Sequence, residues 1–174
     1  MLGMGLFSIP VMLNAETLIQ LWLTLIPPSS PNLLRCLLIA SFLGVITQPF
    51  NTAIHSTGKI KTFSILSGAL LLVMAGVVYV TYALTHNVVA GFGTIVLTQM
   101  LYCIISASFA KKLIPQLSLW LFAKNVLRVL LVIGISCVPA YLLHSVIALS
   151  FLNIVATTIL YASLFLPLTY TFLI

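Results

Sequence analysis

The chain almost lacks acidic side chains: Glu16 is its single carboxylate, against seven lysines and arginines. Only 5% of its 174 residues are charged, whereas 62% are hydrophobic, and the mean hydropathy is +1.29. A soluble domain carries about 25% charged residues, so this chain has too little polar surface to cover an exterior in water. The composition therefore excludes a soluble globular domain and predicts an integral membrane protein.

The sequence also lacks the motifs of catalytic and metal-binding sites. It holds no H-E-x-x-H, G-x-S-x-G or P-loop pattern, and a single carboxylate cannot supply the acid and base pair of a hydrolase. Cys36, Cys103 and Cys137 are far apart in apolar runs and form no zinc-binding pattern. We therefore expect a chain that is not an enzyme and that has no catalytic residues, metal or cofactor.

Basic residues are few, but they outnumber the acids and give a formal net charge of +6 at pH 7. Such a balance can indicate binding to nucleic acid or to an anionic membrane surface. Here the positive residues lie between long apolar runs, which is where the cytoplasmic loops of membrane proteins carry them. We therefore expect the lipid bilayer as a partner, and no nucleic acid.

Long apolar runs make up most of the chain. A bilayer core needs about 20 apolar residues per helix. Six segments qualify, at residues 3–26, 33–55, 62–85, 88–110, 117–143 and 146–174. The sequence thus predicts an all-α fold, a polytopic transmembrane helical bundle of about six spanning helices, with residues 1–174 forming a single bundle. Both ends of the chain lie in apolar runs, which leads us to expect a fragment of a longer protein.

The positions of the basic residues predict the direction of threading. They lie between the second and third segments, and between or just inside the fourth and fifth: Lys59, Lys61, Lys111, Lys112, Lys124 and Arg128. Positive residues on alternate loops mark the cytoplasmic side of a multi-pass protein. We therefore expect six crossings with both termini in the cytoplasm.

Prolines and small residues indicate how the helices bend and pack. Four prolines fall within the predicted segments: Pro10, Pro49, Pro139 and Pro167. Each removes a helix hydrogen bond and favours a kink, which fits a transporter but is also common in other polytopic proteins. Small residues recur at the spacing of helix contacts: Ser64, Gly68, Gly76, Gly91 and Gly93. They indicate ordinary close packing of helices.

Glu16 is a candidate functional residue because it lies in an otherwise apolar first segment, with Gln20 four residues later on the same helix face. An intramembrane carboxylate is costly, so it is a candidate for proton or cation coupling or for contact with a polar substrate. The alternative is that Glu16 lies in water near the outer interface, since Trp22 and two prolines follow it.

Lys124 and Arg128 are candidates for binding an anionic head group. They are four residues apart and share one face of the fifth segment. A basic pocket between helices attracts phosphate, whereas the alternative is that both side chains extend to the membrane interface. Arg35, just inside the second segment, has the same two interpretations.

One stretch resembles a known family. Leu21, Trp22 and Leu23 end the first segment, and the second closes in PFNTAIHSTGKIK, with matching residues Pro49, Ala53, Thr57, Gly58, Lys59, Ile60 and Lys61. This pattern resembles the second half of the polysaccharide (O-antigen) flippases of the multidrug/oligosaccharidyl-lipid/polysaccharide exporter superfamily. There, a helix ending like L-x-L-W-L-G precedes one ending like P-x-x-x-A-x-x-A-T-G-K-I-K. Thr24 and Ser56 depart from the pattern, replacing a glycine and an alanine.

The resemblance implies a two-bundle transporter around a cationic cavity, of which this chain supplies the C-terminal half and lacks the N-terminal one. Such a flippase moves a lipid-linked oligosaccharide, O-antigen or another polysaccharide repeat unit, across the bacterial cytoplasmic (inner) membrane by alternating access. By this interpretation Arg35, Lys124 and Arg128 bind the substrate's diphosphate, and Glu16 couples transport to an ion. The partners are the lipid-linked oligosaccharide and either the missing N-terminal bundle or a second copy.

Two alternatives stay open at the level of the sequence. The first is a drug or small-molecule exporter of the same superfamily, whose cavity would use acids and aromatic residues. The second is a non-transporting membrane scaffold or an inactive truncation.

Overall fold

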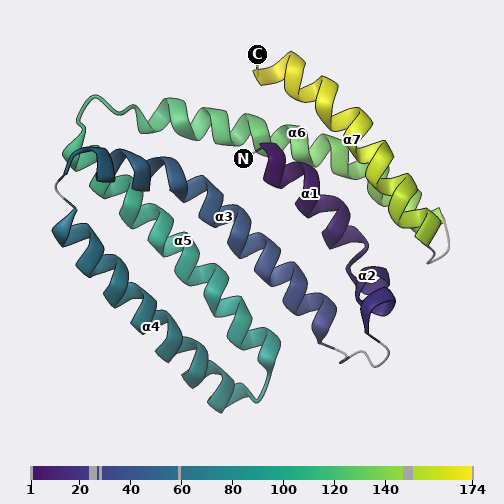
Figure 1. The fold of residues 1–174 in the computed structure, drawn as a ribbon, viewed down its shortest axis with the longest axis horizontal. Coiled ribbons are helices and arrows are strands. Elements are labelled where there is room, and N and C mark those ends of the chain that lie inside the picture. Colours follow the sequence, from purple (N-terminus) through teal and green to yellow (C-terminus); the bar gives the residue numbers. More distant parts are fainter. Residues whose placement is uncertain (1, 24–26, 28, 59, 147–150, 174) are drawn as a thin grey trace. The chain divides into compact units, whose positions relative to one another are not determined.

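The computed structural model describes residues 2–23, 27, 29–58, 60–146 and 151–173. Within these ranges the chain forms seven α-helices and no β-strand (Figure 1). They are α1 (Leu2–Leu13), α2 (Ala15–Trp22), α3 (Ser30–Ser56), α4 (Lys61–Thr85), α5 (Val88–Leu113), α6 (Leu119–Val146) and α7 (Phe151–Leu173). The predicted all-α fold is confirmed.

The helices are long and apolar enough to account for the predicted spans. Among the described residues, five helices, α3 to α7, pass as candidate membrane spans by length and hydropathy. The bent pair of α1 and α2 raises the number to six when it is counted as one span. Each helix overlaps one predicted segment, because the apolar runs are separated by short stretches rich in Pro, Gly, Asn and Lys. The chain is therefore a multi-pass helical membrane protein.

The connection between α4 and α5 shows how these separators end a helix. His86 closes α4 in the left-handed conformation, with φ at 49°, and its N–H donates to the carbonyl of Tyr82 at 2.8 Å. Asn87 then caps α5, since its side-chain oxygen accepts a hydrogen bond from the N–H of Val89 at 2.9 Å. Asparagine is a favoured N-cap because its oxygen satisfies an N–H that has no partner within the helix. The short stretch between the predicted segments 62–85 and 88–110 is thus a tight turn of a helical hairpin.

The described chain divides into two compact units. The terminal unit comprises Met1–Leu34 and Leu121–Ile174, and so contains α1, α2, α7 and nearly all of α6. The central unit is Arg35–Trp120, which holds most of α3 together with α4 and α5. The prediction that residues 1–174 form a single bundle stays a prediction.

In the terminal unit, α1 packs closely against α6 and α7. The hydroxyl of Tyr161 donates to the carbonyl of Gly5 at 3.1 Å, and its ring stacks on Phe165 with centroids 5.4 Å apart. A Cβ added at Gly5 would lie 3.0 Å from Cδ1 of Ile133 and 3.6 Å from Cζ of Phe165. The missing side chain of Gly5 therefore allows the backbone of α1 to approach both neighbours.

In the central unit, α5 contacts both α3 and α4. Tyr102 on α5 donates to the side-chain oxygen of Asn51 on α3 at 3.4 Å. Gly91 lies where α5 meets α4, since a Cβ there would be 3.6 Å from the carbonyl oxygen of Val78. The predicted helix contact is thus confirmed at Gly91. A Cβ at the other three glycines of that prediction would meet no described atom within 4 Å: Gly68, Gly76 and Gly93.

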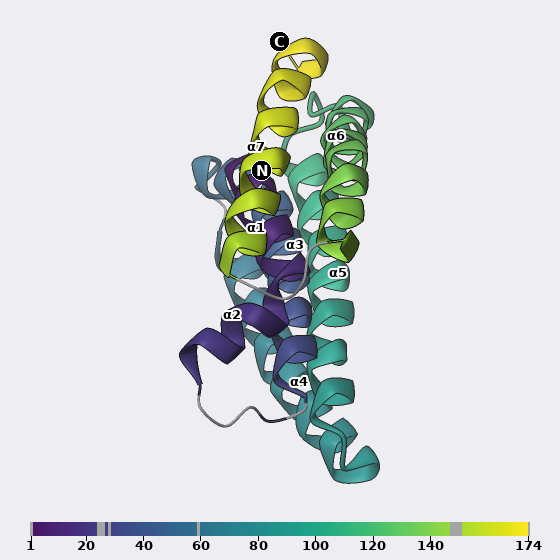
Figure 2. The same cartoon turned by 90° about the vertical axis from the view of Figure 1, so that its right-hand side faces the viewer.

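The sharpest departure from the sequence-based prediction lies in the first segment. A single run over residues 3–26 was expected, but the helix breaks at Asn14, and the axes of Gly3–Leu13 and Ala15–Leu21 differ by 76°. Figure 2 shows α2 turned away from the direction of α1. The four prolines, in contrast, all lie inside helices that continue through them: α1, α3, α6 and α7.

Replacing Gly5 by leucine tests this packing. We expect the free energy of unfolding to fall by about 1–3 kcal/mol, because the new side chain must enter an already filled contact. Gly3→Leu is the matched control on the same helix, since a Cβ at Gly3 meets no described atom within 4 Å. Thermal unfolding of both variants in one detergent, followed by circular dichroism, measures the difference. Equal midpoints for the two variants would contradict the contact.

Candidate functional site

The break between α1 and α2 is built around the side chain of Asn14, which is fully buried at 0% exposure. Its amide nitrogen donates to the carbonyl of Pro10 at 3.0 Å and to the hydroxyl oxygen of Thr157 on α7 at 2.9 Å. Because a carbonyl oxygen can only accept, the nitrogen must face Pro10. The amide oxygen of Asn14 is thereby directed to the other side.

That amide oxygen has no hydrogen-bond partner among the described residues, and Asn14 forms no side-chain cap on α2. The hydroxyl of Thr17, in a residue only 7% exposed, is also unpartnered within the described chain. Asn14 immediately precedes α2, and Thr17 lies in its first turn. Two buried oxygen atoms without partners therefore lie at the start of α2.

Asparagine ends a helix readily because its side chain competes for backbone hydrogen bonds. Here the carbonyl of Pro10 receives both the backbone N–H and the side-chain amide of Asn14, each at 3.0 Å. The side-chain amide of Asn14 also donates a hydrogen bond to the hydroxyl oxygen of Thr157. The break thus arises where the side chain of Asn14 competes for the carbonyl of Pro10 and is also bound to Thr157 on α7.

Glu16, the predicted coupling residue, lies in the first turn of α2 and is exposed. Its carboxylate lies at the N-terminal end of α2, where a negative charge offsets the positive end of the helix dipole. Glu16 is therefore beside the break, and its coupling role stays a prediction.

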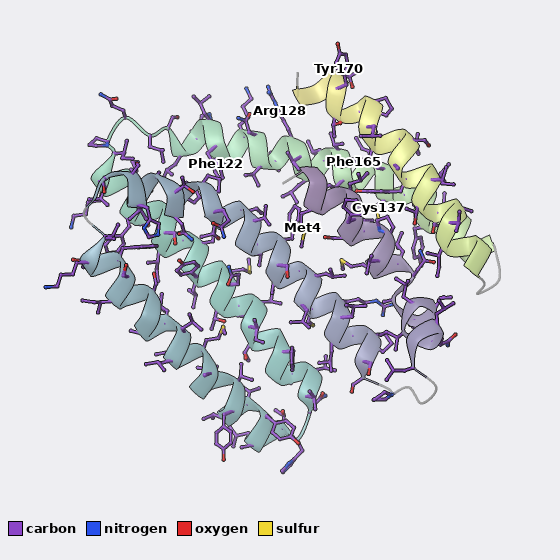
Figure 3. All side chains as sticks on the ribbon, viewed as in Figure 1. Met4, Phe122, Arg128, Cys137, Phe165 and Tyr170 are labelled. Atoms are coloured by element: carbon purple, nitrogen blue, oxygen red, sulfur yellow. The ribbon has the colours of Figure 1, made fainter. Side chains whose placement is uncertain are left out.

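Arg128 and Lys124, the predicted head-group ligands, are both exposed residues of α6. Arg128 is labelled in Figure 3. Arg128 lies nine residues after Leu119, the first residue of α6, which is about 13 Å along the helix axis. The buried stripe of the helix comprises Val129, Val132, Ile133, Ser136 and Ala140. An arginine inside a span is costly against lipid unless its side chain reaches the membrane interface, water or a polar partner.

Arg35, the third predicted cation, lies in the central unit near the start of α3 and is half-buried. It follows Ser30, the first residue of α3, by about 7 Å along the axis. Lys124 and Arg128 belong to the terminal unit. The three cations thus come from two separately described parts, and their joint contact with a diphosphate stays a prediction.

The family-motif residues lie at the end of α2 and around the turn from α3 to α4. Trp22 is the last residue of α2, and its side chain lies outside the described residues, as does the whole of Lys59. Pro49 is an exposed residue inside α3, and Lys61 is the exposed first residue of α4. The motif residues therefore lie at the end of α2, inside α3 and at the start of α4.

The turn itself closes through Thr57 and Gly58. The N–H and the hydroxyl of Thr57 both donate to the carbonyl of Ile54, at 3.1 and 2.7 Å. Gly58 follows with φ at 69°, a left-handed conformation that glycine adopts at little cost, and its N–H donates to the carbonyl of His55 at 3.2 Å. The left-handed backbone conformation therefore explains why the motif has glycine at position 58.

Lysines from two connections meet at one end of the central unit. Lys61 begins α4, while Lys111 and Lys112 lie in the last turn of α5. The rings of Phe63 on α4 and Phe109 on α5 pack with centroids 5.9 Å apart, so these two helix ends are neighbours. Positive charge gathered at one end of a helical hairpin is the pattern of a cytoplasmic membrane face. The orientation itself stays a prediction.

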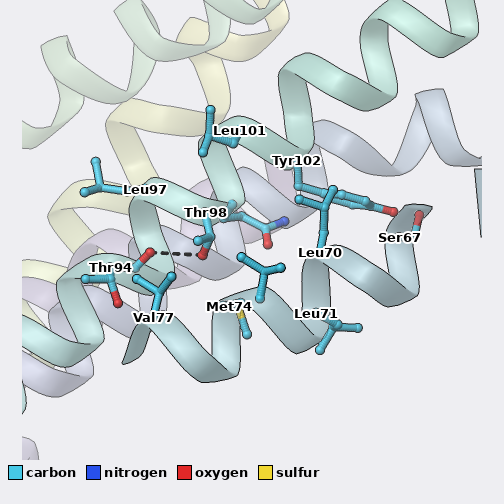
Figure 4. A pocket seen from close by; sticks show the side chains of 12 residues that line it. Ser67, Leu70, Leu71, Met74, Val77, Thr94, Leu97, Thr98, Leu101 and Tyr102 are labelled. Atoms are coloured by element: carbon cyan, nitrogen blue, oxygen red, sulfur yellow. Dashed lines mark hydrogen bonds between the residues drawn. The ribbon is translucent and has the colours of Figure 1, made fainter. Parts of the chain in front are cut away.

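An apolar groove runs between α4 and α5 within the central unit (Figure 4). Its volume is about 530 Å³. Thr94 and Thr98 line it, but both hydroxyls donate to carbonyls of their own helix, Gly91 at 2.6 Å and Thr94 at 2.9 Å. Their bonding is thus satisfied internally, and the groove presents hydrocarbon from leucine, valine and methionine side chains.

Sequence reasoning missed Asn14, Thr17 and Thr157 as site residues. The one signal was a polar residue inside an apolar run, which is expensive in lipid unless a partner satisfies it. That partner, Thr157, is 143 residues away in the sequence. No local pattern identifies it.

Gly58→Ala tests the turn. We expect the free energy of unfolding to fall by about 1 kcal/mol, because a side chain at positive φ is strained. Gly68→Ala is the control inside α4, where a Cβ meets no described atom within 4 Å, and should be neutral or stabilising by up to about 1 kcal/mol. Chemical unfolding in mixed micelles compares the two. A larger loss for Gly68→Ala would contradict the assigned turn.

Comparisons of the chain with protein-family models, with curated proteins and with solved structures found no match. The resemblance to the polysaccharide flippases therefore rests on the motif residues of α2, α3 and α4. What the structure adds is independent of that resemblance: a multi-pass helical protein whose first span is broken at a buried polar residue.

Proposed function

We propose that this chain is one bundle of a membrane flippase. The substrate is a lipid-linked oligosaccharide, O-antigen or another polysaccharide repeat unit, which crosses the bacterial cytoplasmic (inner) membrane by alternating access. The observation that carries the proposal is the first span, broken by 76° at the buried Asn14. Secondary transporters form their substrate and ion sites at discontinuous helices of this kind.

A broken span favours transport over a scaffold role. Irregular backbone at membrane depth is tolerated where protein covers it or where it lines a water-filled cavity. Here the break carries two buried oxygens without partners in the described chain, on Asn14 and Thr17. A scaffold gains nothing from this arrangement, since a continuous apolar helix would be more stable. In a transporter, a bundle that changes conformation can bend at such a break.

The chemistry of α6 supports an anionic substrate. Arg128 is exposed well inside the helix, with Lys124 one turn earlier on the same face. A guanidinium binds phosphate oxygens through two parallel hydrogen bonds, and an ammonium adds a second positive charge. A diphosphate is thus a suitable polar partner for this face, and a second bundle can supply the opposite wall.

The groove between α4 and α5 supports a substrate with a long hydrocarbon chain. It lies on a hairpin of two membrane-spanning helices, and seven of the twelve residues that line it are leucine, valine or methionine. A polyisoprenoid tail matches that lining. The drug-exporter alternative would use acidic side chains, and Glu16 is the only acid in the chain.

Alternating access requires this bundle to move against a partner. The partner in this proposal is either an N-terminal bundle or a second copy of the chain. With both termini and the lysine-rich ends of α4 and α5 in the cytoplasm, two copies would lie in the membrane in the same orientation.

Native mass spectrometry tests the substrate class. The purified chain is released from micelles that contain equal amounts of polyprenyl diphosphate and polyprenol of the same length. We expect the diphosphate to bind at least about tenfold better, which corresponds to about 1.4 kcal/mol and is within the range of a charge-assisted hydrogen bond. Arg128→Gln should remove most of this preference.

Lys112→Gln is the matched control, because it removes one positive charge at an exposed position in the last turn of α5. We expect it to keep the preference for the diphosphate. Equal binding of the two lipids, or equal losses in the two variants, would contradict a diphosphate site at Arg128.

Transport itself is measured in vesicles that contain a labelled lipid-linked oligosaccharide. We expect an impermeant lectin to reach the inner-leaflet sugar in vesicles that hold the chain, and the initial rate should grow faster than linearly with chain density if two copies form the path. Circular dichroism controls for the folded state. Access no greater than in protein-free vesicles would contradict a path made by copies of this chain.

A further inference from the structure

The positive end of the central unit has no carboxylate to balance it. Lys61 begins α4, and Lys111 and Lys112 lie in the last turn of α5. All three lysines are exposed. Residues 35–120, which make up this unit, contain no aspartate or glutamate. The central unit therefore cannot neutralise these charges by itself, and an anion from outside the unit would do so.

The apolar groove of Figure 4 lies on the same two helices as these lysines. On α4 the groove begins at Ser67, the lining residue nearest in sequence to Lys61, and ends at Val77. On α5 the near end is formed by Tyr102, whose ring centroid lies 6.2 Å from that of Phe63 in the second turn from Lys61. One hairpin therefore carries a hydrocarbon groove and, beyond one end of it, a group of positive charges.

The distance from the lysines to the far end of the groove matches the length of a phospholipid. Val77 follows Lys61 by sixteen residues of the same helix, which is about 24 Å along the axis. Half of a bilayer is about 20–22 Å thick when the headgroups are included. A lipid with its headgroup at the lysines can therefore extend an acyl chain along the whole groove.

Lys112 lies on the face of α5 that borders the groove. Thr94 and Leu101 line the groove, and Lys112 follows them by eighteen and eleven residues. These intervals are about five and three turns of an α-helix, so the three residues share one face. Lys111 is turned by about 100° from that face, because it is one residue away. Of this pair, Lys112 is therefore the lysine placed above the groove.

We propose that the hairpin of α4 and α5 binds one anionic diacyl phospholipid of the surrounding membrane. The ammonium group of Lys112 binds the phosphate of the headgroup, and one acyl chain lies in the groove. The second lysine of α5 and Lys61 add to the positive potential at this end, which attracts anionic lipid. The proposal does not depend on the flippase function. In the proposed flippase, the tail of the substrate would enter the groove in place of this acyl chain.

The first experiment is native mass spectrometry of the full chain. The chain is released from micelles that contain equal amounts of phosphatidylglycerol and phosphatidylethanolamine with identical acyl chains, so the two lipids differ only in the headgroup. We expect one retained phosphatidylglycerol per chain, favoured at least about fivefold, the gain that one lysine near a membrane surface provides. Lys112→Gln should remove most of this preference. Equal retention of the two lipids by the wild type would overturn the proposal.

Lys111→Gln is the matched control, because it removes the same charge from the neighbouring residue, which lies on another face of α5. We expect this variant to keep most of the preference for phosphatidylglycerol. Equal losses in the two variants would show a general attraction to a basic surface and would overturn the assigned site.

Quenching of tryptophan fluorescence by brominated acyl chains locates the bound chain. Leu101→Trp places an indole in the groove, whereas Met100→Trp places one at the adjacent residue, which does not line the groove. The two positions are similarly exposed, at 55% and 50%, and both variants keep the two native tryptophans. Brominated phosphatidylglycerol should quench Leu101→Trp at a mole fraction about fivefold lower than brominated phosphatidylethanolamine does, and the two lipids should quench Met100→Trp alike. Equal quenching of Leu101→Trp by the two lipids would contradict an acyl chain of the anionic lipid in the groove.

Discussion

The hydrogen bond between Asn14 and Thr157 is the interaction on which the terminal unit depends. In hydrocarbon no water is present to satisfy a polar group, so a buried amide must find its partner within the protein. Asn14 does so by donating one hydrogen bond to the carbonyl of Pro10 and one to the hydroxyl of Thr157 on α7. The first bond ends α1, and the second holds the end of α1 against a helix from the far end of the chain. The bend of the first span follows from both.

The same solvent explains the distribution of side chains throughout the molecule. Large apolar residues are exposed, such as Leu72 at 78% and Leu84 at 79%, because lipid replaces water outside. Several buried positions are polar instead, including Thr47, Ser106 and Ser136. A membrane protein gains little from burying leucine but needs small and polar residues for close helix contacts. Helix packing therefore accounts for the buried small polar residues. It does not account for the arginine that is exposed on α6.

The sequence was sufficient for the elements that depend on composition and local chemistry. Apolar run lengths predicted the spans, and the short stretches between them hold the turns that His86, Asn87 and Gly58 close. The break at Asn14 was not predictable, because its cause includes a partner 143 residues away. For the same reason, the close contact at Gly5 depends on Ile133 and Phe165, which only the fold brings near. The sequence identified Lys124 and Arg128 as candidates, but their exposure depends on which face of α6 other helices cover.

A double-mutant cycle on Asn14 and Thr157 measures the central interaction most directly. The free energy of unfolding is determined in bicelles for the wild type, Asn14→Ala, Thr157→Val and the double variant. If the hydrogen bond holds the broken span to α7, the two substitutions are coupled by about 0.5–1.7 kcal/mol, the range seen for such bonds between membrane helices. Strictly additive effects would show that the two side chains act independently and would contradict the origin of the break described here.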